Sequence, residues 1–174
     1  LFHSRFAFID RNDKEQKTLE WFGKQNAVNR SGKVIISTQV IEQSIDIDLD
    51  YLISDLAPVD LLIQRAGRLQ RHSRDKQGQL KLTGADERPA PRLDILAPRW
   101  EAQPDEKWLT SAMRNTSYVY PAHSRLWLTQ RILREQGEIR MPDAARLLIE
   151  AVYGEEIDVP EGMKRSEEAA LADY

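Results

Sequence analysis

The 174-residue sequence predicts an α/β fold, in which a parallel sheet with flanking helices is followed by a helical extension. Two apolar runs, the β-branched run at 34–36 and a second run at 51–56, show little polar alternation, which is typical of strands buried on both faces of a parallel sheet. These runs alternate with helical stretches of about ten residues, as crossover connections between parallel strands require. After Pro98 the strand-like runs cease, and only helical periodicity follows.

The first part of the chain is expected to hold a strand end, a helix and a buried strand. Residues 1–8 are typical of a strand that runs into a loop. Residues 12–22 are predicted to be helical, with Asn12 or Asp13 as the N-cap, because apolar residues recur on one face. Residues 33–37 are predicted to form the first complete strand.

Two further strands and one helix are expected before Pro98. Residues 51–56 form the second predicted strand, and residues 93–96 form the third. Asp60 is a good N-cap for a predicted helix over residues 61–72. Beyond Pro98, helices are predicted at about 105–115, 122–136 and 142–153.

These elements divide the chain into three predicted segments. Residues 1–98 form the α/β lobe, residues 99–154 form a helical linker or extension, and residues 155–174 form an acidic tail or the start of another domain. The chain begins with Leu1 inside an apolar run and has no initiator Met. We therefore expect it to be cut from a longer protein.

The net charge of −3 hides a difference between the two parts of the chain. Residues 1–100 carry 16 Lys+Arg against 14 Asp+Glu, and residues 101–174 carry 9 against 14. Binding of nucleic acid would therefore be local and not a property of the bulk charge. The chain lacks cysteine, a signal peptide pattern and an apolar run of about 20 residues, so we expect a cytoplasmic protein that does not cross a membrane.

The densest functional signal lies at residues 64–71, which read Gln-Arg-Ala-Gly-Arg-Leu-Gln-Arg. Arg65, Arg68 and Arg71 are spaced three apart, so they would lie close together on the predicted helix. A guanidinium binds a phosphate with two hydrogen bonds, which makes a triphosphate a natural counter-charge for the cluster. The alternative is a solvated basic helix face that is paired with local Asp and Glu residues.

A second signal lies at residues 37–48, directly after a predicted strand, where α/β proteins place their ligands. The short hydroxyl of Thr38 could contact a phosphate, and Asp46 could accept a hydrogen bond from a sugar. The sequence lacks the Gly and Glu that a calcium loop starting at Asp46 would need. For Asp48 and Asp50 an ordinary acidic loop remains the alternative.

Several common sites are missing from the sequence. It has no Gly-x4-Gly-Lys-Ser/Thr phosphate loop, and neither adjacent Asp-Glu pair follows an apolar strand. The three histidines have no metal-ligand spacing, so no metal site is expected. Phosphate-binding arginines without a phosphate loop predict a partner lobe that holds the triphosphate, as in arginine-finger mechanisms.

Three segments, in order, resemble motifs IV, V and VI of superfamily-two helicases: LFHSRF, STQVIEQSIDID and QRAGRLQRH. They are most similar to the helicase–nuclease of type I CRISPR systems, and the resemblance implies that the α/β lobe is the second RecA-like lobe. Gln39, Ser44 and Gln70 depart from the general motifs, which have an acid, a Gly and a Gly at these positions. The CRISPR branch commonly shows these departures, and the region after residue 124 resembles the helices that follow its motor.

The resemblance implies a role for individual residues. Arg68 and Arg71 would be fingers that reach the γ-phosphate of ATP bound by the first lobe. Gln64 and Arg65 would couple the nucleotide to the nucleic acid or hold the interface between the lobes, and Asp46 would contact the ribose or the fingers.

The motif IV and V residues Ser4, Arg5 and Thr38 would contact the backbone of single-stranded DNA. Such contacts position a strand without reading its sequence.

The same resemblance implies the cofactors and partners. The whole protein would hydrolyse ATP with Mg²⁺, move 3′ to 5′ on single-stranded DNA and degrade it with a separate HD nuclease domain. Its partners would be the first RecA-like lobe and a CRISPR RNA-guided surveillance complex, and this chain alone would be inactive. Two alternatives remain: a motor lobe of another superfamily-two helicase, and a non-catalytic module that binds nucleic acid or an acidic protein through residues 65–74.

Overall fold

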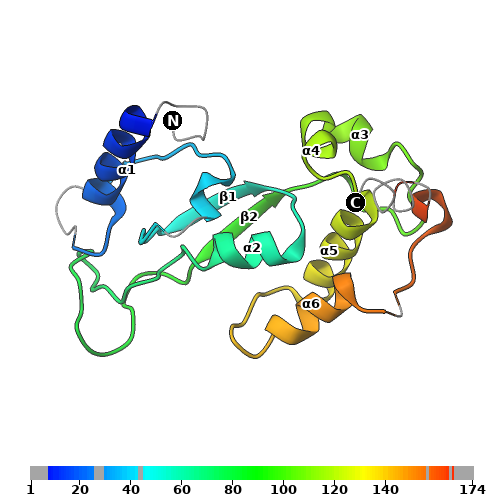
Figure 1. Cartoon of the computed structure of the whole chain (residues 1–174). Helices are drawn as coiled ribbons and strands as arrows, with labels where there is room; N and C mark the ends of the chain where they lie inside the picture. Colours follow the sequence, from blue (N-terminus) through cyan, green and yellow to red (C-terminus); the bar gives the residue numbers. More distant parts are fainter. Residues whose placement is uncertain (1–7, 26–29, 43–44, 156, 165, 167–174) are drawn as a thin grey trace. The chain divides into compact units, whose positions relative to one another are not determined.

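The computed structural model describes residues 8–25, 30–42, 45–155, 157–164 and 166, with side chains from residue 12 onward (Figure 1). The chain forms two compact units, each built from segments that are separate in the sequence. The first unit comprises Leu1–Leu52 and Gln64–Leu93, and the second comprises Ile53–Ile63 and Asp94–Tyr174. The boundaries expected near residues 98 and 154 do not coincide with this division and stay predictions.

A parallel two-stranded sheet is formed by β1 (Tyr51–Asp55) and β2 (Arg92–Leu96). The pairing continues one residue past β1, where the backbone N–H of Leu56 donates to the carbonyl of Leu96 at 2.9 Å. Helix α2 (Val59–Ala66) follows β1 in the sequence. The α/β fold with parallel strands and flanking helices is therefore confirmed, and both strands occur where the sequence predicts them.

The first unit contains α1 (Phe8–Phe22) and a short 3-10 helix, η1 (Gln39–Glu42). Two isolated bridges tie the segment after η1 to the rest of this unit: Ile47 pairs with Gly23, and Leu49 pairs with Leu69. The buried core of this unit consists of Phe22, Val40, Ile41, Ile45, Ile47 and Leu49. The core thus lies beside the segments that carry the candidate functional residues.

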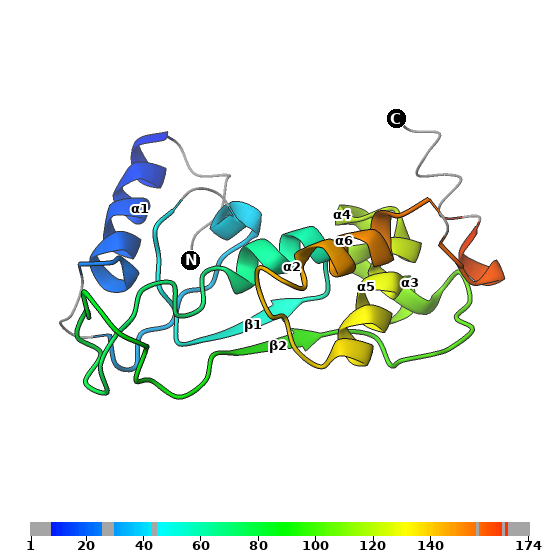
Figure 2. The same ribbon diagram turned by 90° about the horizontal axis from the view of Figure 1, so that it is seen from below.

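The second unit contains the helices that follow β2. Its helices are α3 (Trp108–Ala112), α4 (Arg114–Val119), α5 (His123–Gln136) and α6 (Ala145–Tyr153). Helices α5 and α6 lie side by side in both views (Figures 1 and 2). Helix α5 ends at Gln136 and is capped by Gly137, which takes the left-handed conformation with φ 71° that favours glycine. Among the described residues, no helix has the length and apolar character needed to cross a membrane.

One predicted strand is wrong. Of the predicted residues 33–37, only Ser37 forms a β-bridge and none belongs to a strand, and Val34 and Ile36 are 79% and 66% exposed. A β-branched run favours extended backbone, but burial on both faces also requires a neighbouring strand on each side. Within the described part of the chain no strand pairs with Val34 or Ile36, so their side chains face solvent.

The predicted helix starts also need correction. Helix α1 begins at Phe8, so Asn12 and Asp13 lie inside it and do not cap it. Helix α2 begins at Val59, which places Asp60 in its first turn and not at the N-cap. The carboxylate of Asp60 instead accepts a hydrogen bond from the Tyr153 hydroxyl at 2.6 Å.

Helix α2 ends earlier than expected, and this changes the geometry of the arginines. The sequence predicts a helix up to residue 72, but α2 stops at Ala66. Beyond Ala66, backbone groups that would continue the helix bind Leu49 instead. The N–H of Leu49 donates to the carbonyl of Arg68, and the N–H of Gln70 donates to the carbonyl of Leu49, both at 2.8 Å. Arg68 and Arg71 therefore lie in a turn and a loop, not on one helix with Arg65.

Candidate nucleotide interface

Arg65 joins the end of α2 to η1. Its Nε and Nη2 atoms both donate to Oε1 of Glu42, at 2.8 and 2.5 Å, and both side chains are largely buried. Two hydrogen bonds from one guanidinium to a carboxylate fix the distance and orientation between the two segments. Arg65 thus holds the motif VI segment against the motif V segment.

Arg68 makes the next contact between the same two segments. Its Nε donates to the carbonyl of Ile41 at 3.1 Å and its Nη2 to that of Glu42 at 3.2 Å. Arg68 is only 8% exposed, and burial followed by the nearby charge of Arg71 lowers its pKa from the ordinary value. An arginine stays charged in spite of such shifts, so its contacts place a positive charge at the end of η1.

Arg71 is directed toward solvent and meets Asp46. Its Nε lies 2.9 Å from Oδ1 of Asp46, and the two side chains are 42% and 48% exposed. The Nε2 of His72 lies 2.8 Å from the same oxygen. Burial would raise the pKa of Asp46, but His72, and then Arg71, hold it below the ordinary value. Asp46 is therefore a carboxylate with two donors.

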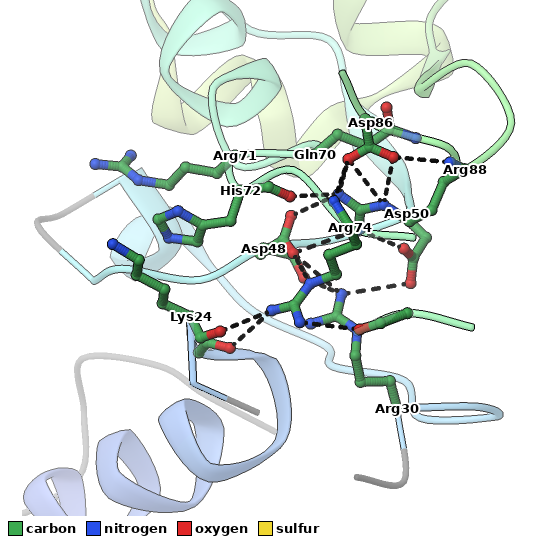
Figure 3. A network of polar contacts seen from close by, with 12 residues as sticks. Lys24, Arg30, Asp48, Asp50, Gln70, Arg71, His72, Arg74, Asp86 and Arg88 are labelled. Atoms are coloured by element: carbon green, nitrogen blue, oxygen red, sulfur yellow. Dashed lines mark hydrogen bonds and ion pairs between the residues drawn. The ribbon is translucent and has the colours of Figure 1, made fainter. Parts of the chain in front are cut away.

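Behind this exposed pair lies a buried network that is centred on Asp48 (Figure 3). Asp48 and Arg74 are fully buried, and the Nε of Arg74 donates to Oδ2 of Asp48. The other guanidinium nitrogens of Arg74 donate to the carbonyls of Gly78, Gly23 and Lys24, at 3.0, 3.1 and 3.1 Å. One arginine thus connects three loops through groups that would be costly to leave unpaired.

Arg88 and Arg30 complete the network. Arg88 binds Asp48 at 3.2 Å, Asp50 at 2.8 Å and Asp86 at 2.6 Å. The hydrogen bond from Arg88 is the main cause that lowers the pKa of Asp86 to about 2, although burial opposes it. Arg30 donates to the backbone carbonyl of Asp48 at 2.5 Å. In Figure 3 the Arg71 side chain points away from these residues.

Sequence reasoning missed this network. The sequence left Asp48 and Asp50 open to interpretation as an ordinary acidic loop. In the structure, Asp48 is fully buried and forms ion pairs with three arginines. A signal was nevertheless present in residues 45–50, where apolar residues alternate with Asp. Period-two alternation places the apolar side chains on one side and the three carboxylates on the other. The apolar residues enter the core of the first unit, and the carboxylates meet the basic residues that follow α2.

The remaining predicted site residues are less well placed. Thr38 is exposed just before η1, and its carbonyl accepts from the N–H of Ile41 at 3.3 Å. Gln64 is exposed on α2. Ser4 and Arg5 lie outside the described residues. In the described part of the chain, no group of three or more His, Cys, Asp and Glu side chains is arranged to hold a metal ion.

The structure contradicts the idea of a continuous basic face over residues 65–74. The side chains of Arg65, Arg68 and Arg74 are largely or fully buried against carboxylates and carbonyls, and only Arg71 of these four is half exposed. Neither a solvated basic helix nor a docking face for an acidic partner fits this arrangement. Their contacts instead serve to fix the Arg71–Asp46 pair relative to η1.

Comparison with known proteins agrees with these motifs. Residues 1–74 match the family described as "CRISPR-associated nuclease/helicase Cas3, C-terminal". The CRISPR-associated endonuclease/helicase Cas3 of Escherichia coli (strain K12) is 36% identical over 97% of the chain. The CRISPR-associated nuclease/helicase Cas3 of Streptococcus thermophilus is 39% identical over 91% of it. The chain belongs to the Cas3 family. It is the C-terminal helicase lobe.

The solved Cas3 structures extend the likeness to the fold. The structure of T. fusca Cas3 with AMPPNP has a TM-score of 0.75 and 29% identity, covering 99% of this chain and 18% of that one. A structure of a CRISPR RNA-guided surveillance complex in a pre-nicking state contains a chain with a TM-score of 0.70 and 29% identity, covering 99% of this chain and 20% of that one. The expected RecA-like α/β lobe with a helical extension is thus confirmed.

The chain spans only a small part of these relatives. It covers 18% of the length of the E. coli Cas3 and 15% of the S. thermophilus Cas3. The comparisons identify a CRISPR-associated motor lobe and favour the CRISPR branch over other helicases. The roles of individual site residues stay predictions.

Proposed function

We propose that this lobe completes the ATPase site of a Cas3-type, single-stranded-DNA-dependent motor. Arg71 and Arg68 act as arginine fingers toward ATP that is bound by the first RecA-like lobe, and Asp46, Gln64 and Arg65 support this interface. The observation that carries the proposal is the half-exposed Arg71 beside a carboxylate, on loops fixed by a buried arginine network. Related T. fusca structures are described with AMPPNP, ADP and ATP, which supports a nucleotide as cofactor.

The two proposed fingers differ in the contacts that they lose when they bind a phosphate. The Arg71 guanidinium is near the surface, and Asp46 is its charged partner among the described residues, so a phosphate can replace this partner more easily than the partners of a buried arginine. Arg68 is bound to backbone carbonyls of η1 and must leave them to reach a phosphate. Arg71 is therefore the principal finger in this proposal, and Arg68 contributes after the motif V segment shifts.

The proposal also assigns the metal ion, the DNA and the partner complex of the motor. In this proposal, Mg²⁺ is held mainly by the first lobe together with the triphosphate. Thr38, with Ser4 and Arg5, contacts the backbone of single-stranded DNA. A CRISPR RNA-guided surveillance complex is the partner, which the likeness to a chain in the structure of such a complex supports. The whole protein works in the cytoplasm, and this chain alone does not hydrolyse ATP.

The test is DNA-stimulated ATP hydrolysis by the full-length protein. We expect Arg71→Ala to lower kcat by roughly 10³-fold or more, because loss of an arginine finger removes transition-state stabilisation. Arg68→Ala should lower it too. Arg146→Ala is the matched control, since that arginine is exposed on α6 and pairs with Glu150 on the same helix. Near-normal turnover by Arg71→Ala and Arg68→Ala would show that the assignment is wrong.

A further inference from the structure

Two donors share one oxygen of Asp46, and they differ in how firmly they are held. The Oδ1 atom of Asp46 accepts from Arg71 Nε at 2.9 Å and lies 2.8 Å from His72 Nε2. Since the carboxylate can only accept, the imidazole carries a proton on Nε2. The His72 side chain is 16% exposed, against 42% for Arg71.

His72 is anchored to the buried network, whereas Arg71 is not. The backbone carbonyl of His72 accepts a hydrogen bond from Nη2 of Arg88 at 2.8 Å. Arg88 is itself held by Asp86, Asp50 and Asp48. The imidazole therefore projects from a fixed backbone, and Figure 3 shows it beside this network while Arg71 extends outward.

With His72 in place, Arg71 can leave Asp46 without depriving that carboxylate of every hydrogen bond to these two donors. When Arg71 moves to a phosphate, Asp46 would lose its guanidinium partner, which costs free energy for a partly buried carboxylate. His72 keeps one hydrogen bond on the same oxygen and reduces that cost. Without His72, Arg71 would be the remaining partner of Asp46 among the described residues, and Asp46 would hold it more strongly back from the nucleotide.

We propose that His72 is a positioning residue that holds Asp46 while Arg71 exchanges between Asp46 and the triphosphate. The proposal rests on the function proposed above, because it assumes that Arg71 is a finger. It assigns to the imidazole one task, the donation of a hydrogen bond from Nε2. His72 itself touches no substrate.

The experiment compares His72→Leu with His72→Gln in the full-length protein. Leu removes the donor at a similar volume, and the amide of Gln can place an N–H near the position of Nε2. We expect His72→Leu to lower kcat of DNA-stimulated ATP hydrolysis about tenfold while KM for ATP changes less than about threefold. His72→Gln should restore kcat to within about threefold of wild type.

Two controls separate positioning from folding. His123→Leu replaces another partly buried histidine, which contacts the carbonyl of Ser117 at 3.3 Å, and should leave kcat unchanged. In an Arg71→Ala background, His72→Leu should cause less than a twofold further loss in single-turnover rate, because His72 acts through Arg71. If His72→Leu melts early, His72→Asn, whose shorter amide keeps a polar group but stops short of Asp46, takes its place.

The outcomes are distinguishable. Full turnover by the His72→Leu and His72→Asn variants, together with a strong defect in Arg71→Ala, would overturn the role of His72 and leave the finger intact. Equal defects in His72→Gln and His72→Leu would also overturn it, since the hydrogen bond would then be irrelevant. Normal turnover by Arg71→Ala would reject the proposed function itself.

Discussion

Gln70 shows how a single backbone angle explains a departure from a motif. Its φ is 44°, in the left-handed region, and general superfamily-two motifs have Gly at this position. The Gln70 backbone N–H pairs with Leu49, and its side-chain amide donates to the carbonyl of Pro89 at 2.6 Å. The side-chain hydrogen bond offsets part of the cost of the unusual conformation.

We expect Gln70→Val to lower the free energy of unfolding by about 1–2 kcal/mol, because a β-branched residue is poorly tolerated at positive φ. Urea unfolding of the chain measures this. Gln70→Asn is the control, since Asn accepts the left-handed region while its shorter amide also loses the contact with Pro89. Equal stabilities of the Val and Asn variants would show that the backbone angle does not matter.

Asp86 makes the stability of the chain depend on pH. Its pKa is lowered to about 2, chiefly by Arg88, so its carboxylate contributes stability above its ordinary pKa near 4. That contribution is lost as the pH falls from about 4 toward 2. The stability difference between wild type and Asp86→Asn should therefore be constant at neutral pH and shrink below about pH 4. A difference that grows on acidification, in urea unfolding at several pH values, would contradict this.

At the scale of elements, the segment between η1 and β1 organises the candidate site. Its apolar residues enter the core of the first unit, and its carboxylates bind the basic residues that follow α2. The pairing of Leu49 with Leu69 then ends α2 and turns Arg68 toward η1. Motifs V and VI are thus one structural unit, and a change in one would move the other.

Asp48→Asn should destabilise the chain by about 3–5 kcal/mol, because it leaves the buried guanidinium of Arg74 without its charged partner. Asp50→Asn is the matched control, since Asp50 binds the same Arg88 but its side chain is largely exposed; its cost should stay near or below about 1 kcal/mol. Chemical unfolding of both variants gives the comparison. Similar losses for the two would show that burial of the network is unimportant.

At the scale of the whole molecule, the division into two units does not follow the order of the chain. The chain passes between the units inside β1, α2 and β2. The core of the second unit accordingly combines Leu56, Val59 and Leu62 with helices that come much later in the sequence. Within the second unit, the later helices therefore share one core with part of the α/β segment.

The neighbouring leucines of α6 test this core. Leu148 is fully buried, whereas Leu147 is 46% exposed. We expect Leu148→Ala to cost about 2–5 kcal/mol and Leu147→Ala less than about 1 kcal/mol. Hydrogen exchange should then show faster exchange in α5, α6 and the start of α2 for the Leu148 variant. Loss of protection confined to α6 would mean that the helices do not share one core.

The sequence by itself determined the fold class, both strands of the sheet, the helical character of the extension and the order of motifs V and VI. These follow from local signals: short apolar runs, helical periodicity and residue spacing within a motif. The early end of α2 escaped prediction because the competing hydrogen bonds come from Leu49, which lies far from α2 in the sequence.

Only the tertiary structure decided which charges are buried. Arg68, Arg71 and Arg74 look alike in the sequence, yet Arg74 lies fully buried with Asp48, Arg68 is buried against η1, and Arg71 is half exposed beside Asp46. The physical reason is that desolvation and pairing depend on contacts between segments about 25 residues apart.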